Sequence, residues 1–367
     1  ATVTSAADEP CSFDPETTCR AVELRVDGSD ATATLETGLD TSTPAAELGV
    51  GDEVVLNDAG EDVPAEARYS FADLRRGLPL TVLALLFAAA VIALGRWKGL
   101  LALAGVAVTF VILLGFLFPA LLNGAPPVAV ALTAATLIAF GTLYLAHGVN
   151  ERTTVALLGT LASLGLTAAL AVAFSGAAQL SGLASEESLS LLTAAPDLDF
   201  RGLLLAAVII GALGVLDDVT VTQVSAVAEL RRSDPAASRR ELVRSATRIG
   251  RDHIASTVNT LVLAYSAAAL PLLLIYSQSG LGLGNALTSE TIAVEIVQTL
   301  VGSIGLVASV PLTTVLAAWV IPAPPPAAAA PADVGTGPST STGPGPGPGE
   351  PGTRPRPAPR AVRPEPG

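Results

Sequence analysis

The sequence predicts an all-α transmembrane bundle of about seven helices with a small N-terminal extracytoplasmic β domain, and three observations support this fold class. Half of the 367 residues are apolar and only 14% are charged, whereas a soluble domain usually has about 25% charged residues. The charged residues are dense before Leu78 and sparse between Leu78 and Ile321. The apolar region divides into runs of roughly 20 residues, the length of helix that crosses a bilayer core.

Residues 1–76 form the predicted extracytoplasmic domain. This segment holds 17 acidic and 5 basic residues, so most of the chain's net charge of -13 belongs to it. An acidic surface repels phosphates, which excludes nucleic acid as a partner. The other interpretation of the charge is solubility alone, and the sequence names no protein partner.

The same domain shows the period of β-strands. Apolar and charged residues alternate from Val22 to Val26, which predicts a half-buried strand. The turn signal at residues 27–30 leads to an expected return strand over residues 31–37. A second pair of strands is expected to flank residues 49–52, with residues 53–57 as one arm.

Both cysteines of the chain, Cys11 and Cys19, lie in this domain. Their spacing predicts a small disulfide loop if the domain is outside the cytoplasm. Two cysteines without a nearby histidine do not make a structural zinc site, so we expect no metal and no cofactor. The chain has no methionine and begins at Ala1, so we expect that an upstream signal or anchor segment has been removed.

Seven apolar runs make up the predicted transmembrane bundle, residues 77–321. They cover residues 78–95, 100–122, 128–146, 154–175, 202–227, 254–276 and 292–321. With the N-terminus outside, the inner loops hold ten Lys and Arg residues, and the outer loops after the first run hold only Arg201. Arg75 and Arg76 oppose this orientation, but the positive-inside rule still places residues 1–76 outside. Residues 322–367, rich in Pro, Gly and Ala, are expected to be a disordered cytoplasmic tail.

Two adjacent acids, Asp217 and Asp218, lie in the fifth run. An ionisable group in a membrane costs several kcal/mol unless it is paired or hydrated, so it usually faces a bundle interior. By helical spacing Asp218 shares a small, polar face with Gly211, Gly214 and Thr222. We therefore expect Asp218 to face other helices and Asp217 to lie nearer the edge or water. The alternative is that both acids lie near the cytoplasmic end and meet water.

Two enzymatic interpretations of these acids are disfavoured. An intramembrane aspartyl protease needs acids on two facing helices, but adjacent residues on one helix point about 100° apart. A magnesium-diphosphate site needs another acid one turn on, where this chain has Val221 and Thr222. There is also no P-loop, so we expect that the protein is not an enzyme.

Other polar residues in the apolar runs are candidates for a pathway through the bundle. Asn259 in the sixth run is expected to bond across helices. Glu295 and Gln298 begin a polar and small stripe that continues to Gly305 and Ser309 in the seventh run. A similar stripe in the fourth run is interpreted as packing alone, and it consists of Gly159, Ser163 and Thr167.

The loop between the fifth and sixth runs is basic. Asp234 and Pro235 have the pattern of a helix start. An apolar stripe of Leu242, Ala246 and Ile249 then predicts a helix on the inner leaflet. Its basic stripe is expected to bind anionic lipid, or else represents ordinary positive-inside charge. That stripe consists of Arg240, Arg244, Arg248 and Arg251.

Three stretches of the sequence resemble the YibE/F-like family of bacterial membrane proteins. They are Gly211–Asp218, Gly250–Tyr265 with Asn259-Thr260-Leu261 at its centre, and Glu295–Thr314, and the resemblance extends over about Leu48 to Thr314. The resemblance implies a multi-pass protein of a bacterial plasma membrane with an upstream membrane segment. It also implies that Asp218 matches the acid of the family, whereas the position of Asp217 is ordinarily apolar in the family.

The polar residues of the spans predict a solute or ion transporter with an intramembrane carboxylate site. Asp218 is the expected proton or cation site, and a small solute or an ion is the expected substrate. The alternative is a non-transporting membrane scaffold or sensor whose N-terminal domain binds a partner.

Overall fold

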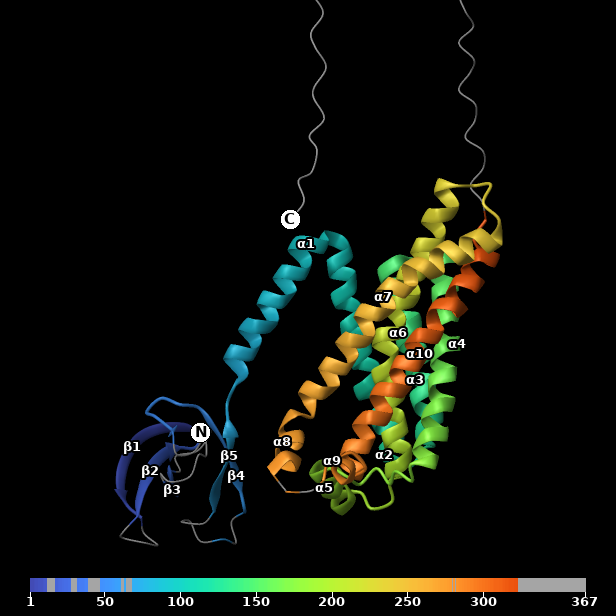
Figure 1. The fold of residues 1–367 in the computed structure, drawn as a ribbon. Helices are drawn as coiled ribbons and strands as arrows, with labels where there is room; N and C mark the ends of the chain where they lie inside the picture. The colour runs from blue at the N-terminus through green and yellow to red at the C-terminus, as the bar shows by residue number, and fades with distance from the viewer. Residues whose placement is uncertain are drawn as a thin grey trace, which may run out of the picture. The chain divides into compact units, whose positions relative to one another are not determined.

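The computed structural model describes residues 1–11, 17–27, 32–38, 47–60, 63, 68–278, 280 and 282–322. The predicted tail lies outside the described residues except for Pro322, and so do most residues of the turn predicted at 27–30. The described chain is largely helical, with a small β region at its N-terminal end (Figure 1).

The N-terminal β region contains two antiparallel sheets. β1 (Thr2–Pro10), β2 (Thr18–Arg25) and β3 (Thr32–Gly38) form a sheet in that order, and the predicted strand at Val22–Val26 and its return strand are β2 and β3. β2 alternates as expected, because Val22 and Leu24 are buried and Glu23 is exposed. β1 was not predicted, since its sequence has few large apolar residues.

The second sheet corrects one prediction. β4 (Val54–Asp58) matches the expected arm, but its partner strand is β5 (Tyr69–Leu74), which follows it in the chain, and residues 49–52 do not join the two strands. Residues 49–52 form a turn in which the Asp52 amide donates to the Gly49 carbonyl at 3.1 Å. The chain after this turn runs beside β1, where the Val3 amide donates to the Asp52 carbonyl at 2.9 Å.

A disulfide joins Cys11 to Cys19, with their Cα atoms 4.9 Å apart. It links the segment after β1 to β2, and both cysteines are buried. The core beneath the sheets is small and consists of Val3, Val22, Leu24, Ala33, Leu35, Leu48 and Val54. A core of this size supplies little stability, so a covalent link is valuable here.

The helical region consists of a series of long helices joined by short segments (Figure 1). They are α1 (Gly77–Ile112), a π-helical turn η2 (Leu113–Leu117), α2 (Phe118–Leu122), α3 (Pro127–His147), α4 (Glu151–Ala177), α5 (Glu186–Ala194), α6 (Phe200–Ser233), α7 (Arg239–Ala268), α8 (Leu270–Gln278), α9 (Leu283–Leu287) and α10 (Glu290–Val320).

The predicted count of seven spans is not confirmed. Among the described residues, five helical segments are long and apolar enough to cross a membrane, and six if α7 and α8 count as one bent span. α8 is inclined by 61° to α7, and Pro271 at this bend cannot donate the next helical hydrogen bond.

The first two predicted runs fall within one segment, Gly77–Leu122. This segment is interrupted at Arg96, whose φ of 51° and ψ of -128° are not helical. The chain doubles back there (Figure 1), and a Cβ on Gly99 would overlap the carbonyl oxygen of Val91. The absence of a side chain at Gly99 therefore permits the tight reversal.

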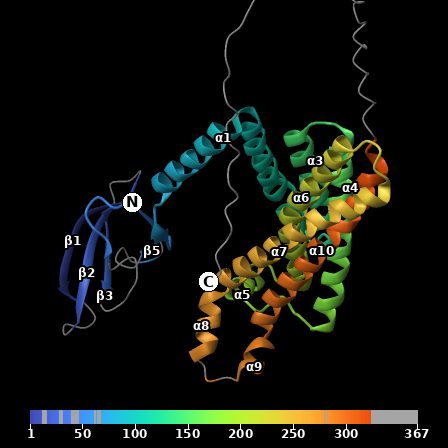
Figure 2. The same cartoon turned by 45° about the horizontal axis from the view of Figure 1, so that its top comes forward.

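The bundle core is built by α3, α4, α6 and α10, and α4 and α10 lie side by side in both views (Figures 1 and 2). Their contact uses the two stripes of small residues seen in the sequence. Gly159 of α4 lies against Thr313, and Gly305 of α10 lies against Thr167. Ser163 and Ser309 are fully buried at the intermediate position of each stripe, so small side chains allow the two helices to approach closely.

Candidate functional site

The paired acids of α6 do not lie as predicted. Asp218 is exposed, together with Gly211, Gly214 and Thr222 on the same face. Asp217 is half-buried, its Oδ1 is buried without a hydrogen-bond partner among the described residues, and the side chain of Thr142 on α3 faces it. The prediction that Asp218 faces other helices and Asp217 the edge is therefore wrong.

Asp217 and Asp218 exchange their expected positions because the other helices cover the apolar face of α6. The large apolar residues of α6 pack into the common core with α3, α4 and α10, and they include Ile209, Leu213, Leu216 and Val219. In lipid the hydrophobic effect favours burial of neither face, so side-chain packing decides, and here the large apolar face is the one that packs. Asp217 lies at the border of the buried apolar face, and Asp218 lies outside it.

The exposed face of α6 meets polar residues of two other helices at Gly211. A Cβ on Gly211 would lie 3.4 Å from the Tyr265 hydroxyl of α7 and 3.5 Å from Gln298 Nε2 of α10. Gln298 donates a hydrogen bond of 3.3 Å to that hydroxyl. Gln298 thus lies with the α6 stripe as a candidate pathway group, and Tyr265 joins them although it was not predicted as a site residue.

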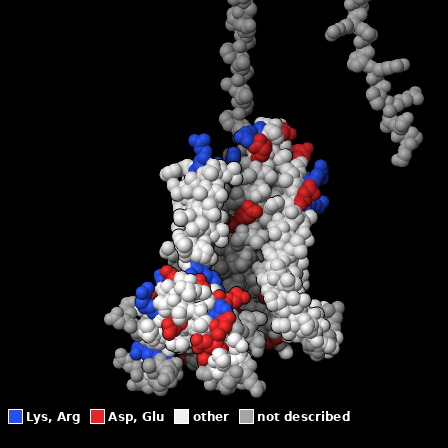
Figure 3. Space-filling view, turned by 90° about the vertical axis from the view of Figure 1, so that its left-hand side faces the viewer, with Lys and Arg blue, Asp and Glu red and all other residues white. Residues whose placement is uncertain are grey.

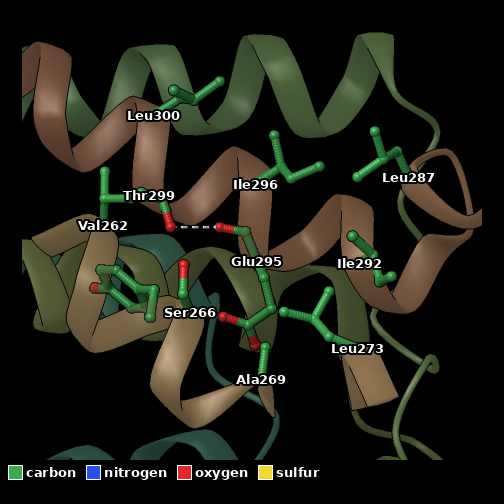
Figure 4. Close-up of a pocket in the computed structure, with 11 residues that line it drawn as sticks. Val262, Ser266, Ala269, Leu273, Leu287, Ile292, Glu295, Ile296, Thr299 and Leu300 are labelled. Carbon is green, nitrogen blue, oxygen red and sulfur yellow. Dashed lines mark hydrogen bonds between the residues drawn. The ribbon is translucent and has the colours of Figure 1, made fainter. Parts of the chain in front are cut away.

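Glu295 lies at a pocket of about 290 Å³ between α7, α8, α9 and α10. Its carboxylate extends from α10 toward Ser266 and Ala269 of α7 and its C-terminal end (Figure 4), and its backbone carbonyl accepts a hydrogen bond of 2.7 Å from Thr299. The rest of the lining is mostly apolar and consists of Val262, Tyr265, Leu273, Leu287, Ile292, Ile296 and Leu300.

A second, more polar pocket of about 200 Å³ lies between α3, α4 and α6. It contains His147, Asn150 and Arg152, and on α6 it is lined by Val221, Val224 and Ser225. Val221 is one helical turn from Asp217. This pocket therefore comes within a turn of the half-buried acid, from the end of the bundle where α3 ends and α4 begins.

The charged side chains are unevenly distributed over the helices. In Figure 3 the helical body presents a mostly uncharged face, basic side chains lie with some acidic ones at its upper end, and acidic atoms are visible in the hollow between two white columns. The acids within the apolar part of the spans are Asp217, Asp218 and Glu295. None of them has a salt bridge among the described residues.

Asn259 does not make the expected interhelical bond. Its side chain is exposed on α7, and no hydrogen bond joins it to the described residues. The neighbouring Thr260 hydroxyl donates to the Ser256 carbonyl of its own helix at 3.1 Å. The Asn259 side chain is therefore open at the surface of α7.

Besides Gln298, a second amide bonds across helices, and this residue, Gln223, was missed by the sequence reasoning. It is 3% exposed, and its Nε2 donates to the Ala246 carbonyl of α7 at 2.8 Å and to the Thr314 hydroxyl of α10 at 2.6 Å. A Cβ on Gly250 would lie 2.8 Å from Gln223 Oε1. An amide in an apolar run was the available signal.

The basic segment is the first part of α7 and not a separate surface helix. Its cap is Ser238, which forms a capping box with Glu241, so the predicted start at Asp234 is wrong. Asp234 instead ends α6. Leu242 and Ala246 pack against α6 and α10, and Ile249 is exposed, so the predicted apolar stripe contacts protein more than lipid.

The four arginines of the predicted lipid-facing stripe are exposed on α7, and they are Arg240, Arg244, Arg248 and Arg251. The helix start is held to the end of α10, where the Arg239 guanidinium lies 4.5 Å from the centroid of the Trp319 ring. No cluster of three or more metal-ligating side chains occurs within the described part of the chain.

Comparison with known proteins supplies the family. No curated protein and no solved structure matches the chain. The family model described as YibE/F-like protein matches residues 83–323, which is more than half of the chain and includes all the helical sites above. The chain belongs to the YibE/F-like protein family.

Proposed function

We propose that the protein is an ion-coupled transporter of a small solute, with Asp217 and Asp218 as its proton or cation site and Glu295 on the solute pathway. The observation that carries this proposal is the arrangement of two pockets. One comes within a turn of Asp217 and the other contains Glu295. The hydrogen bond between Gln298 and Tyr265 lies where the Glu295 pocket, lined by Tyr265, comes close to Gly211 of α6.

The energetic argument is that an unpaired carboxylate persists in a membrane only where water, a proton or a cation reaches it. The orphaned Oδ1 of Asp217 and the exposed carboxyl of Asp218 meet this description. A scaffold or sensor needs no such groups and favours a hydrogen-bonded, buried Asp218. The transporter is therefore the preferred function, and it includes no catalytic step.

The proposal includes a topology of seven crossings. Gly77–Leu122 would cross twice because of the reversal at Arg96, and α7 with α8 would cross once. An odd number of crossings places the two ends of the chain on opposite sides, with residues 1–76 outside the plasma membrane and the basic end of the bundle, including Arg240 and Arg244, against anionic lipid.

The orientation is tested with a cysteine placed at Ser341. We expect a membrane-impermeant thiol reagent to leave this cysteine unmodified in intact cells and to modify it after permeabilisation. Cys11 and Cys19 are paired in a disulfide, so they do not compete for the reagent. Strong modification in intact cells would overturn the orientation.

Transport is tested with the purified protein in liposomes that enclose a pH-sensitive dye. We expect wild-type protein to dissipate an imposed proton gradient, and Asp217→Asn and Asp218→Asn each to reduce the flux at least tenfold, because Asn keeps the size but not the titration. Gly302→Ala is the control, since a Cβ there has no neighbour within 4 Å. Unchanged flux in both Asn variants would reject the carboxylate site.

A further inference from the structure

We propose that the pocket around Glu295 binds an organic cation with apolar substituents, and that the Glu295 carboxylate is its counter-charge. This inference adds a substrate class to the proposed function. Transport of the cation rests on that function, whereas its binding does not. Binding itself follows from the charge, the lining and the size of the pocket.

The charge of the pocket has no counterpart within this part of the chain. The sequence contains no Lys or Arg between Arg251 and Arg354, so α8, α9 and α10 supply no basic group. Arg201 is directed elsewhere, because a Cβ on Gly176 of α4 would lie 3.0 Å from its guanidinium. The half-buried Glu295 therefore needs a positive charge from outside the chain, or a proton.

The nearby acid Glu290 cannot take this role. Its Oε1 accepts hydrogen bonds from the Ser181 amide at 2.5 Å, from the Ser181 hydroxyl at 2.7 Å and from the Gly182 amide at 3.1 Å. These bonds connect the loop after α4 to the start of α10. Glu290 is thus a structural carboxylate, whereas Glu295 makes no side-chain hydrogen bond to the described residues.

The lining favours an organic cation over a metal ion. Calcium and magnesium need six or more oxygen ligands, but the pocket offers few besides Glu295. The Thr299 hydroxyl already donates to the Glu295 carbonyl, and the Tyr265 hydroxyl already accepts from Gln298. The remaining walls are aliphatic, with one aromatic ring, Tyr265, that can contact a cation.

The volume limits the size of the solute. Small-molecule sites usually have about 300–1,000 Å³, and a cavity of about 150 Å³ holds benzene. The volume of about 290 Å³ therefore fits one ring that carries a small ammonium group. Phenyltrimethylammonium has these features, and tert-butylbenzene is its neutral counterpart of nearly the same shape.

The test measures binding of these two probes by calorimetry to the full protein in lipid nanodiscs. We expect saturable binding of phenyltrimethylammonium that weakens at least tenfold in Glu295→Gln. Glu186→Gln is the matched control, because Glu186 is an exposed acid of α5 outside the pocket, and we expect it to bind as wild type does. Ala269→Leu fills the pocket without changing its charge and should also weaken binding at least tenfold.

Two results would overturn the inference. The first is equal affinity of the cation for wild type and Glu295→Gln, where both proteins have the same melting temperature. The second is tighter binding of tert-butylbenzene than of the cation to wild type, which would mark the pocket as a groove for lipid chains. If the wild-type protein carries protons but does not bind the cation, this inference alone is rejected, and if it binds the cation but carries no protons, only the transporter is rejected.

Discussion

Replacing Gly305 by Ala tests whether the close approach of α4 and α10 holds the bundle together. A Cβ on Gly305 would overlap Thr167 Oγ1 and would lie 3.2 Å from Thr167 Cβ. The hydroxyl cannot rotate away freely, because Thr167 is fully buried and donates to the Ser163 carbonyl at 2.9 Å. The two helices must therefore separate, or this hydrogen bond must break.

The magnitude follows from the cost of this overlap. Overpacking a buried site costs about 1–3 kcal/mol. Gly→Ala within a helix also stabilises by about 1 kcal/mol, and this gain is shared by Gly302→Ala, which meets no atom within 4 Å. The free energy of unfolding of Gly305→Ala should thus be about 1–3 kcal/mol lower than that of Gly302→Ala.

The assay is unfolding in mixed micelles with increasing sodium dodecyl sulfate, followed by circular dichroism. Thr167→Ala removes the overlapping hydroxyl, so the double variant with Gly305→Ala should recover most of the lost stability. Equal unfolding free energies for Gly305→Ala and Gly302→Ala would refute the reasoning, because the two changes differ only in the contact that α4 provides.

Two further predictions concern Gln223 and Asp58. Gln223→Leu should lower the unfolding free energy by about 1–2 kcal/mol in the same assay, because it removes two bonds across helices, whereas Thr222→Ala on the exposed face should change little. The Arg68 side-chain hydrogen bond lowers the pKa of Asp58 from 3.8 to about 2, so its stabilising effect is present above about pH 4 and lost toward pH 2. Protection of the β4 and β5 amides from hydrogen exchange should therefore fall between about pH 4 and pH 2 in wild type and not in Asp58→Asn. The same pH profile in both proteins would contradict this prediction.

Much of the fold followed from the sequence because the relevant signals are local. The alternation at Val22–Val26 produced β2, and the apolar runs produced the long helices. The strand pairing of β4 was wrong because the turn at residues 49–52 was interpreted as the centre of a strand pair, whereas β4 pairs with β5, which follows it in the chain. The reversal at Arg96 requires a glycine at position 99, because a side chain there would overlap Val91. The sequence alone does not show this contact.

The site was less predictable because it depends on which faces the helices bury. Helical spacing correctly separated Asp217 from Asp218, but it did not state which side of α6 would be covered. In water the apolar side would be the clear choice, whereas in lipid both sides are tolerated. The contact of Gln298 with Tyr265 joins residues 33 positions apart on two helices, and no local pattern indicates such a pairing.

The packing also indicates which part of the bundle would move in the proposed transport cycle. α4 and α10 are interlocked at Gly159 and Gly305, and α7 is fixed near its start by the bond from Gln223 to Ala246. Beyond Ile254, by contrast, α7 has no fully buried residue, and it ends at the bend into α8. Segments with few buried contacts open at the lowest free energy. We therefore expect the outer part of α7 with α8 to move against a static core, and this movement would open and close the pocket around Glu295.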